Sequence, residues 1–150
     1  TMPEVAFEPG RSIVADAGLT LYTVGTIKRI PGYKSYVSVD GGMGDNPRYI
    51  LYGSKYTALL ANKANEEANE PVTVAGKWCE SGDLIGENMM LPKVEVGDTL
   101  AVLATGAYNY SMASNYNRIP RPPIVAISEN KKQIIVKRET YEDIIKNDLV

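Results

Sequence analysis

The amino-acid sequence predicts a mainly β fold, a Greek-key-like β-barrel or sandwich with short helices. Five or six short segments are rich in β-branched, aromatic and other apolar residues, and turn-forming residues separate them. The chain has 150 residues, enough for one domain with its own core, and shows neither an internal repeat nor a low-complexity tract. Because each short strand must bury one face, such a succession of strands favours a barrel or a sandwich.

The first segments lead from an apolar run into the clearest strand. The sequence VAFEPGR (residues 5–11) predicts the end of a buried strand, followed by a Pro-Gly turn. In residues 12–18 we expect a short helix, with Ser12 at its N-cap and Gly18 at its C-cap. Residues 19–30 combine β-branched and aromatic side chains and therefore predict a strand.

The middle of the chain alternates turns, strands and polar loops. A turn at residues 31–35 precedes a strand at 36–42, in which polar and apolar residues alternate up to a glycine pair. Residues 43–56 predict a polar loop that leads into an apolar patch. Residues 57–70, rich in Ala, Asn and Glu, predict either a short helix or a solvated loop.

The last part of the chain predicts two more strands, a hairpin and a helix. Residues 71–78 are expected to form a strand, and residues 91–105 a turn and a strand. Residues 122–138 predict a hairpin, with its turn at the Glu-Asn pair in the middle. Residues 139–148 predict a short amphipathic helix.

Composition limits the partners and the chemistry. The 16 Lys and Arg residues against 18 Asp and Glu give a net charge of −2, which offers no electrostatic reason to expect nucleic acid or an anionic membrane surface. No apolar run approaches the roughly 20 residues of a membrane-spanning helix. The chain has no histidine, which excludes Ser-His-Asp and Cys-His catalysis and His-ligated metals. A single cysteine excludes zinc held by several thiolates, so we expect no metal site. It also excludes an internal disulfide, which suits a protein located in the reducing cytoplasm.

The segment EPGRS (residues 8–12) has the composition of an anion-binding turn. Backbone N–H groups at the start of a helix favour an anion, and Gly10 permits close approach of the backbone. Arg11 can bind a carboxylate or a phosphate through two N–H groups. The alternative is an ordinary strand-to-helix turn with a surface ion pair, because such short motifs are common.

The segment VDGGMGDNPRYILY (residues 39–52) is rich in glycine, which is costly in conformational entropy unless the backbone must bend. Aspartate and asparagine side chains supply hydrogen-bond acceptors there. Arg48 and Tyr52 lie four residues apart and would point the same way on a helix. Both a ligand-binding loop and a plain turn-rich loop remain open.

The segment WCESGD (residues 78–83) holds the single cysteine beside two carboxylates. A thiol can donate a proton, and a neighbouring carboxylate can bind an ammonium group. The alternative is a buried apolar cysteine, which is the common role of a lone cysteine. The polar neighbours favour the catalytic interpretation.

The segment TGAYNYSMASNYNRIPRP (residues 105–122) contains several tyrosines and amides after a glycine. Its phenol groups could reach phosphate or substrate oxygens. A short helix that packs its tyrosines on the sheet is the equal alternative.

Taken together and in order, these segments resemble the C-terminal part of diaminopimelate decarboxylase, of the fold-type III pyridoxal-phosphate decarboxylase family. That enzyme makes L-lysine and CO₂ from meso-diaminopimelate. The resemblance covers the chain from about Phe7 to Asp148. It rests on six segments: EPGRSIVADAGLTLYTV, VDGGMGDNPRYILYGSKY, WCESGDLI, LPKVEVGDTLAV, TGAYNYSMASNYNRIPRP and KRETYEDII.

The resemblance implies a domain organisation and a partner. Residues 1–18 are expected to be the last strand and helix segment of an N-terminal (β/α)₈ barrel, and residues 19–150 the C-terminal β-rich domain. The lysine that holds the pyridoxal phosphate would then lie outside this chain. We therefore expect a fragment that is inactive alone and belongs to a homodimer with shared active sites. An exposed sheet edge or apolar patch, with a risk of non-native association, is also expected.

The resemblance also assigns roles to residues. Cys79 resembles the catalytic acid that returns a proton after CO₂ leaves. The expected cofactor-phosphate contacts are Glu8, Pro9, Gly10, Arg11 and Tyr108. The expected ligands of meso-diaminopimelate are Arg11, Arg48, Tyr52, Glu80 and Tyr108.

Two alternatives stay open at this stage. The substrate could be another basic amino acid, such as ornithine, arginine or carboxynorspermidine, because the family shares one fold type. The chain could also be a non-catalytic β-domain used for binding or assembly.

Overall fold

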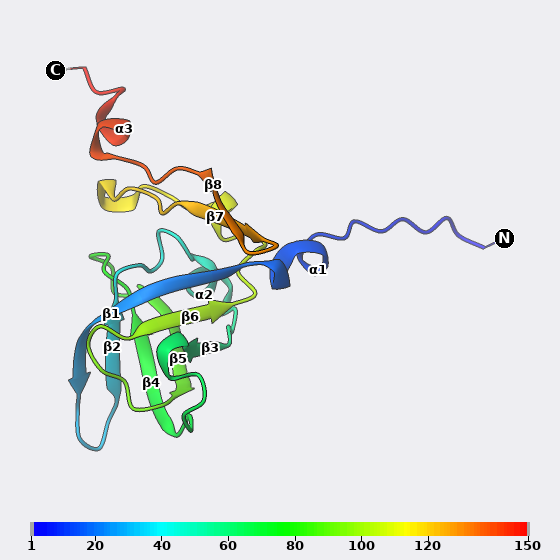
Figure 1. Cartoon of the computed structure of the whole chain (residues 1–150). Coiled ribbons are helices and arrows are strands. Elements are labelled where there is room, and N and C mark those ends of the chain that lie inside the picture. The colour runs from blue at the N-terminus through cyan, green and yellow to red at the C-terminus, as the bar shows by residue number, and fades with distance from the viewer. Residues whose placement is uncertain (1, 150) are drawn as a thin grey trace.

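Six strands form one sheet: β1 (Leu19–Arg29), β2 (Ser35–Val39), β3 (Ala58–Leu60), β4 (Glu70–Ala75), β5 (Leu84–Leu91) and β6 (Thr99–Leu103). The computed structural model describes residues 2–149. The strands lie in the order β3-β6-β1-β2-β4-β5, and only β2 and β4 pair in parallel. The outermost strands β3 and β5 also contact each other, so the sheet nearly closes into a barrel (Figure 1). The mainly β fold expected from the sequence is confirmed.

Alternate side chains of the strands fill the interior of this barrel. On β1, Tyr22 and Val24 are buried, whereas Leu19 and Leu21 face outward and remain exposed. All six strands contribute to one apolar core. Its fully buried members include Val37, Leu60, Val74, Ile85, Leu100 and Val102. The core therefore supports the loops at the rim of the barrel.

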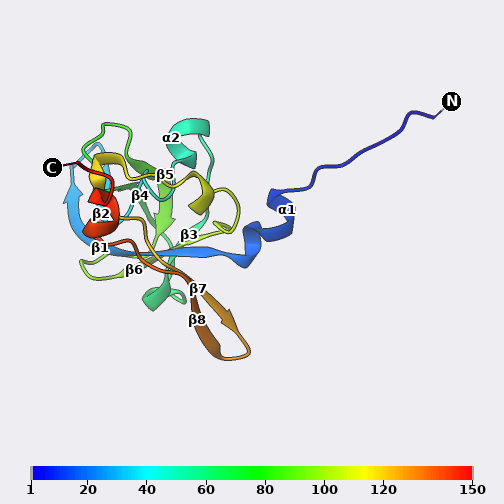
Figure 2. The ribbon, with the colours of Figure 1, turned by 90° about the horizontal axis from the view of Figure 1, so that it is seen from above.

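A separate hairpin of β7 (Ile124–Ser128) and β8 (Lys131–Val136) follows the barrel. It projects beyond the barrel when seen from above (Figure 2). Glu129 and Asn130 both adopt positive φ at its turn, as a tight two-residue hairpin requires, so this prediction is confirmed. The helix α3 (Tyr141–Ile145) is also confirmed, and Thr140 and Asp143 form its capping box.

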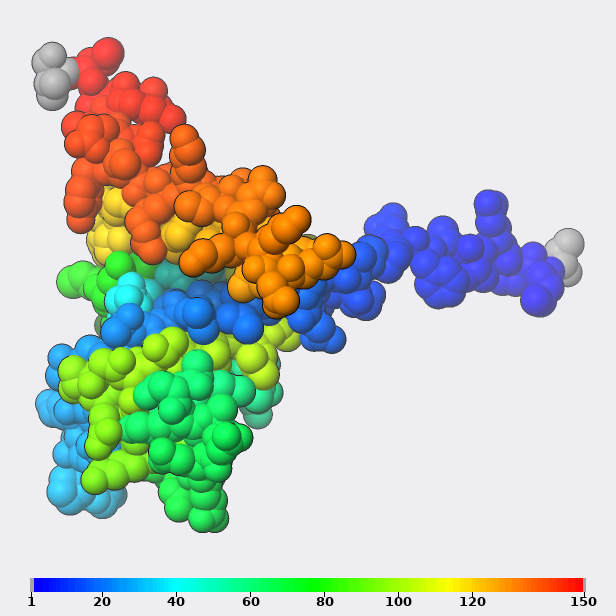
Figure 3. Space-filling view, viewed as in Figure 1, coloured from blue at the N-terminus to red at the C-terminus, as the bar shows by residue number. Residues whose placement is uncertain are grey.

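The N-terminal segment differs from expectation. Residues 2–9 are exposed, form no strand and extend away from the barrel (Figure 3). The strand expected at residues 5–8 finds no neighbouring strand to pair with within residues 2–149, and an unpaired strand is not stable. A single helical turn, α1 (Arg11–Val14), and a 3₁₀ turn, η1 (Ala15–Ala17), follow. Gly10 rather than Ser12 occupies the N-cap, whereas Gly18 is the C-cap as expected.

Sequence patterns missed several short elements. The helix α2 (Arg48–Tyr52) lies in the expected polar loop, between Pro47 and a left-handed Gly53. Residues 57–70 were expected to form a short helix or a solvated loop. They contain strand β3 and the 3₁₀ turn η2 (Ala61–Lys63), followed by turn and loop up to the start of β4. Strand β5 was not expected because Gly86 and Asn88 interrupt its alternation, and Asn88 has positive φ. Two further 3₁₀ turns, η3 (Tyr110–Met112) and η4 (Tyr116–Arg118), lie in the tyrosine-rich segment.

None of the helices within residues 2–149 has the length and hydrophobicity to cross a lipid bilayer.

Candidate functional site

A pocket of about 1170 Å³ brings three of the sequence motifs together. Residues from the EPGRS segment, from α2 and from the turn after β6 line it, among them Glu8, Gly10, Arg11, Arg48, Tyr56 and Tyr108. These segments are up to 100 residues apart in the chain, and the barrel rim places them side by side. Most of the cofactor and substrate contacts expected from the resemblance therefore converge on one cavity. Pro9 lies in sequence between two lining residues, whereas Tyr52 does not line the pocket and stacks against Arg48, which does.

Tyr108 lies next to both pocket arginines. The guanidinium carbons of Arg11 and Arg48 are each 5.4 Å from the centre of its ring, within the range of cation–π attraction. Its hydroxyl lies where a Cβ of residue 10 would be, only 2.0 Å from that position, so residue 10 must be glycine for this approach. Tyr108 also has a φ of 67°, a strained conformation that non-glycine residues often adopt at functional sites.

Arg48 brings an incompletely paired cation to this pocket. Its Nη1 contacts Met112 Sδ at 3.5 Å, and its guanidinium carbon stacks 4.8 Å from the ring centre of Tyr52. Within residues 2–149, its buried Nε has no hydrogen-bond partner and its guanidinium forms no ion pair. Such an orphaned donor next to a cavity suits an anionic ligand, because a buried unpaired polar group is otherwise costly.

Cys79 and Glu80 lie on a separate, exposed loop. Within the described residues neither lines the pocket that holds Arg48 and Tyr108. The Cys79 backbone N–H donates to Asn117 Oδ1 at 3.3 Å, and the Tyr116 hydroxyl donates to Glu80 Oε2 at 3.2 Å. Hydrogen bonding to Glu80 raises the pKa of the Tyr116 phenol. The expected site residues thus divide into one group within a pocket and one group facing solvent.

Two buried carboxylates, Asp45 and Asp83, hold the loops that carry Arg48 and Cys79. Sequence reasoning noted them only as polar neighbours and did not predict this role. Asp83 accepts the backbone N–H groups of Met43 at 2.6 Å and Trp78 at 2.7 Å. Asp45 accepts the Tyr22 hydroxyl at 2.5 Å and the Gly42 N–H at 2.9 Å. Burial raises the pKa of Asp45 to about 6 and also raises the pKa of Asp83.

The glycines of the 39–52 segment are explained by packing within the domain. A Cβ on Gly41 would meet the Tyr22 ring at 2.1 Å, and one on Gly44 would meet the Trp78 ring at 2.2 Å. These glycines let large side chains lie against the backbone. The glycines of this segment therefore serve packing and do not line the pocket. Arg48, which follows them in the chain, does line it.

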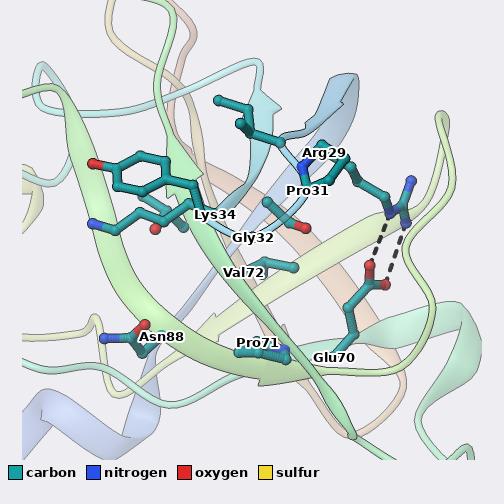
Figure 4. Close-up of a pocket in the computed structure, with 12 residues that line it drawn as sticks. Arg29, Pro31, Gly32, Lys34, Glu70, Pro71, Val72 and Asn88 are labelled. Carbon is teal, nitrogen blue, oxygen red and sulfur yellow. Dashed lines mark hydrogen bonds and ion pairs between the residues drawn. The ribbon is translucent and has the colours of Figure 1, made fainter.

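A smaller pocket of about 390 Å³ lies between the β1–β2 turn and β4. Arg29 and Glu70 form an ion pair beside it, with Arg29 Nε and Glu70 Oε1 2.8 Å apart (Figure 4). Lys34 is likewise paired with Glu87. Because these charges are already neutralised by one another, and none of the expected site residues lines this pocket, it is the weaker candidate.

Residues 12–106 match the family described as "Pyridoxal-dependent decarboxylase, C-terminal sheet domain". The chain belongs to this family. Its curated relatives in the family include diaminopimelate decarboxylases from Bacillus subtilis, 57% identical over 99% of this chain, and from Staphylococcus aureus, 54% identical over 97% of it. The chain spans about a third of the length of these relatives, 34% and 35%.

Solved structures of the family share the fold. The diaminopimelate decarboxylase from M. jannaschii in complex with L-lysine superposes with a TM-score of 0.88 at 42% identity, covering 99% of this chain and 34% of that one. A lysine/ornithine decarboxylase from Vibrio vulnificus in complex with cadaverine is more distant, with a TM-score of 0.63 at 27% identity over 74% of this chain and 30% of that one. The resemblance drawn from the sequence motifs is confirmed at the level of the family.

Proposed function

We propose that this chain provides the C-terminal sheet domain of a pyridoxal-phosphate-dependent diaminopimelate decarboxylase, a carboxy-lyase that makes L-lysine. The convergence of Arg11, Arg48 and Tyr108 on one pocket is the observation that carries this proposal. Two arginines suit a substrate with a carboxylate at each end, because each arginine can bind one carboxylate through two N–H groups. The relatives named diaminopimelate decarboxylase have higher identity than the lysine/ornithine decarboxylase, which favours this substrate over other basic amino acids.

The residues around Gly10 fit a phosphorylated cofactor. The Tyr108 hydroxyl and the Arg11 guanidinium lie together at the pocket wall, and both are donors that suit a phosphate. The neighbouring residues Glu8 and Pro9 shape the approach to Gly10. When bound, pyridoxal phosphate supplies the electron sink that stabilises the charge left by departing CO₂.

The remaining pocket residues bind and orient the substrate. Arg48 lines the pocket without an ion pair in residues 2–149, so its guanidinium is available to a carboxylate. The Tyr52 ring stacks on the Arg48 guanidinium and limits its orientation. Arg11 and Tyr108 line the same cavity and can also bind substrate oxygens.

Cys79 and Glu80 act on an active site other than the pocket formed by this chain. Cys79 Sγ donates the proton that replaces the lost carboxylate, and Glu80 binds the distal ammonium group. Because both side chains face solvent on a firmly held loop, they suit a composite site in a two-fold dimer. The lone cysteine suits a reducing cytoplasmic location.

In this proposal, residues 1–18 belong to the barrel that carries the cofactor lysine, and residues 19–150 form the sheet domain. The exposure of residues 2–9 agrees with a segment that packs against another domain.

Lysine release from meso-diaminopimelate tests the proposal. A chimaera is made in which this chain replaces the matching third of the Bacillus subtilis relative, and it is assayed with added pyridoxal phosphate. The chain alone and the intact relative are assayed in parallel. We expect lysine from the chimaera and from the relative, and none from the chain alone, because the cofactor lysine lies outside it.

Cys79→Ala in the chimaera tests the proton-donor role. We expect kcat to fall by about 100-fold or more, the usual contribution of a positioned acid, with little change in KM. Ser81→Ala on the same loop is the control and should leave kcat unchanged. The folded, cofactor-loaded chimaera could instead release no lysine and decarboxylate ornithine or arginine. In that case the substrate would be one of those amino acids and not meso-diaminopimelate. A chimaera that decarboxylates none of them would support a binding or assembly domain.

A further inference from the structure

Asp83 joins two loops that the sequence separates by about 40 residues. One loop, residues 40–46, leads into α2 and Arg48, and the other, residues 76–83, holds Cys79. Asp83 Oδ1 accepts the N–H of Met43 from the first loop, and Oδ2 accepts the N–H of Trp78 from the second. The side chain is only 4% exposed, so both bonds lie in the interior. One carboxylate thus fixes the backbone of both loops.

The carboxylate is confined on both sides by glycines. A Cβ on Gly42 would lie 2.4 Å from Asp83 Oδ1, and a Cβ on Gly76 would lie 2.2 Å from Oδ2. No side chain larger than hydrogen fits at either position without displacing the carboxylate. Asp83 therefore has one tightly defined position, and the two loops share it.

Further bonds transmit this position to Cys79. The loop backbone is closed by Gly76 N–H to Asp83 O at 2.8 Å, and Lys77 N–H reaches Gly41 O at 3.1 Å. Trp78 is also held by its indole N–H, which donates to Tyr116 O at 2.9 Å. Cys79 follows Trp78 directly, so a shift of Trp78 moves the thiol.

We propose that Asp83 is a positioning residue that fixes Cys79 and Glu80 relative to the Arg48 helix. This inference rests on the proposed function, because it concerns the placement of a proton donor and a substrate ligand. A buried carboxylate is a poor way to stabilise a loop, since desolvation offsets most of its gain. Its value lies in geometry: two acceptors at a fixed separation hold two backbones in register, and an apolar side chain cannot do this.

The tyrosine–carboxylate pair Tyr22–Asp45 offers a matched control. It holds the same 40–46 loop from the β1 side, through Gly42, and has no bond to the 76–83 loop. Tyr22→Phe removes its buried hydrogen bond and keeps the ring that packs on Gly41. This variant therefore weakens the fold without releasing Trp78.

The first measurement uses the fluorescence of Trp78, the only tryptophan of the 150-residue chain. Asp83→Asn replaces one acceptor with a donor that faces a backbone N–H, so one of the two tethers is lost. We expect its emission to shift to longer wavelength and its quenching by acrylamide to rise, as Trp78 moves outward. Tyr22→Phe should lower the melting temperature but leave both signals unchanged. This readout does not depend on decarboxylase activity.

The second measurement uses the active chimaera. Asp83→Asn should lower kcat by about 10- to 100-fold, the cost of a small misplacement of a reacting group, and should also raise KM, because Glu80 shifts with the same loop. The 40–46 loop remains held by Asp45, so Arg48 keeps its position. Tyr22→Phe should leave kcat unchanged.

Gly76→Ala provides an independent way to displace the carboxylate, because its methyl group would occupy the space of Oδ2. It should reproduce the fluorescence and kcat changes of Asp83→Asn. Unchanged Trp78 signals and kcat in either folded variant would overturn the proposal. If neither Asp83→Asn nor Gly76→Ala folds, Asp83 is needed for stability rather than for positioning, and the proposal is overturned as well. If the unmodified chimaera is inactive, the proposed function fails, whereas the fluorescence still decides whether Asp83 holds the loop.

Discussion

Arg48 is the residue whose environment most clearly demands a ligand. Its buried Nε lacks a partner within residues 2–149, although Tyr52 and Met112 contact the rest of the guanidinium. We predict that Arg48→Ala in the chimaera lowers kcat/KM for meso-diaminopimelate by about 10- to 100-fold. A hydrogen bond to a charged group contributes roughly 1.5–3 kcal/mol, which corresponds to this range. Steady-state lysine release measures the effect.

Arg29→Ala is the matched control for Arg48. Arg29 is paired with Glu70 beside the smaller pocket and is nearly half exposed, so its loss should barely change stability or turnover. Equal losses in the two variants would mean that the Arg48 effect is not specific to the substrate.

Asp45 should make the stability of the domain fall as pH rises. Its pKa in the folded state is raised by burial from 3.8 to about 6. A group with a raised folded pKa contributes stability that is complete below its unfolded pKa and lost as pH rises through the folded one. The expected loss between about pH 4 and pH 7 is roughly 3 kcal/mol, at about 1.36 kcal/mol per pKa unit.

Urea unfolding of the 150-residue chain, followed by Trp78 fluorescence, measures this slope. Asp45→Asn should flatten most of it, because its amide can accept from Gly42 and donate to Tyr22 without carrying a charge. A slope of the same sign should remain from Asp83, whose pKa is also raised by burial. The exposed Asp16→Asn serves as control, and an unaltered slope in Asp45→Asn would contradict the assignment.

At the scale of elements, Glu139 connects the base of the β7–β8 hairpin to the tyrosine-rich segment. It accepts Arg121 Nε at 2.9 Å, the Arg121 backbone N–H at 2.8 Å and Asn115 Nδ2 at 2.7 Å. The Arg121 contact holds the pKa of Glu139 down at about 2. Its stabilisation is therefore complete above the ordinary pKa of 4.5 and is lost as pH falls through about 2.

Glu139→Gln should loosen the hairpin and α3 at neutral pH. We expect faster amide hydrogen exchange in β7, β8 and α3, with a local cost of about 2 kcal/mol from the lost charged hydrogen bonds. The difference in thermal stability from the unmodified chain should shrink toward pH 2. Glu129→Gln, at the exposed hairpin tip, should change neither measurement. Unchanged exchange in Glu139→Gln would show that other contacts hold the hairpin.

The elements differ in how far local sequence determines them. Strand β1, the β7–β8 hairpin and α3 were predicted because β-branched residues, a Glu-Asn turn and an amphipathic pattern act within a few residues. Strand β5 was missed because it depends on pairing with β4 across two register shifts, and Gly86 and Asn88 hide its alternation. The N-terminal strand, in contrast, was predicted but does not form. Its apolar run has no strand to pair with among the described residues.

At the scale of the whole molecule, the hairpin presents an apolar face. Ile127 and Ile134 are 79% and 63% exposed, and Val125 lies on the same face because Val125 pairs with Ile134. An exposed face of this kind favours association of the isolated chain. We predict that the chain forms concentration-dependent oligomers that light scattering detects.

Ile127→Lys combined with Ile134→Thr should shift these oligomers toward monomer without lowering the melting temperature, because both side chains are already exposed. Gln133→Lys on the opposite face of β8 is the control for added charge. Oligomers that persist in the double variant would assign the association to another surface.

The two groups of site residues show why the site itself is a property of the tertiary structure. Local patterns marked Arg11, Arg48, Cys79 and the tyrosine-rich segment as separate candidates. The resemblance to a family singled out Tyr108 and assigned the roles. Only the rim of the barrel brings the two arginines to the ring of Tyr108. The same rim keeps Cys79 on the exposed loop, outside the pocket formed by the described residues.

The sequence by itself determined the mainly β class, the family, the hairpin and the identity of the candidate residues. These depend on local turn chemistry, on side-chain alternation and on motifs that are contiguous in the chain. The tertiary structure alone decided the closure of the barrel, the pocket and the roles of Asp45 and Asp83. Those features arise from contacts between residues tens of positions apart, and burial gives a carboxylate its pKa and its partners only after the chain has folded.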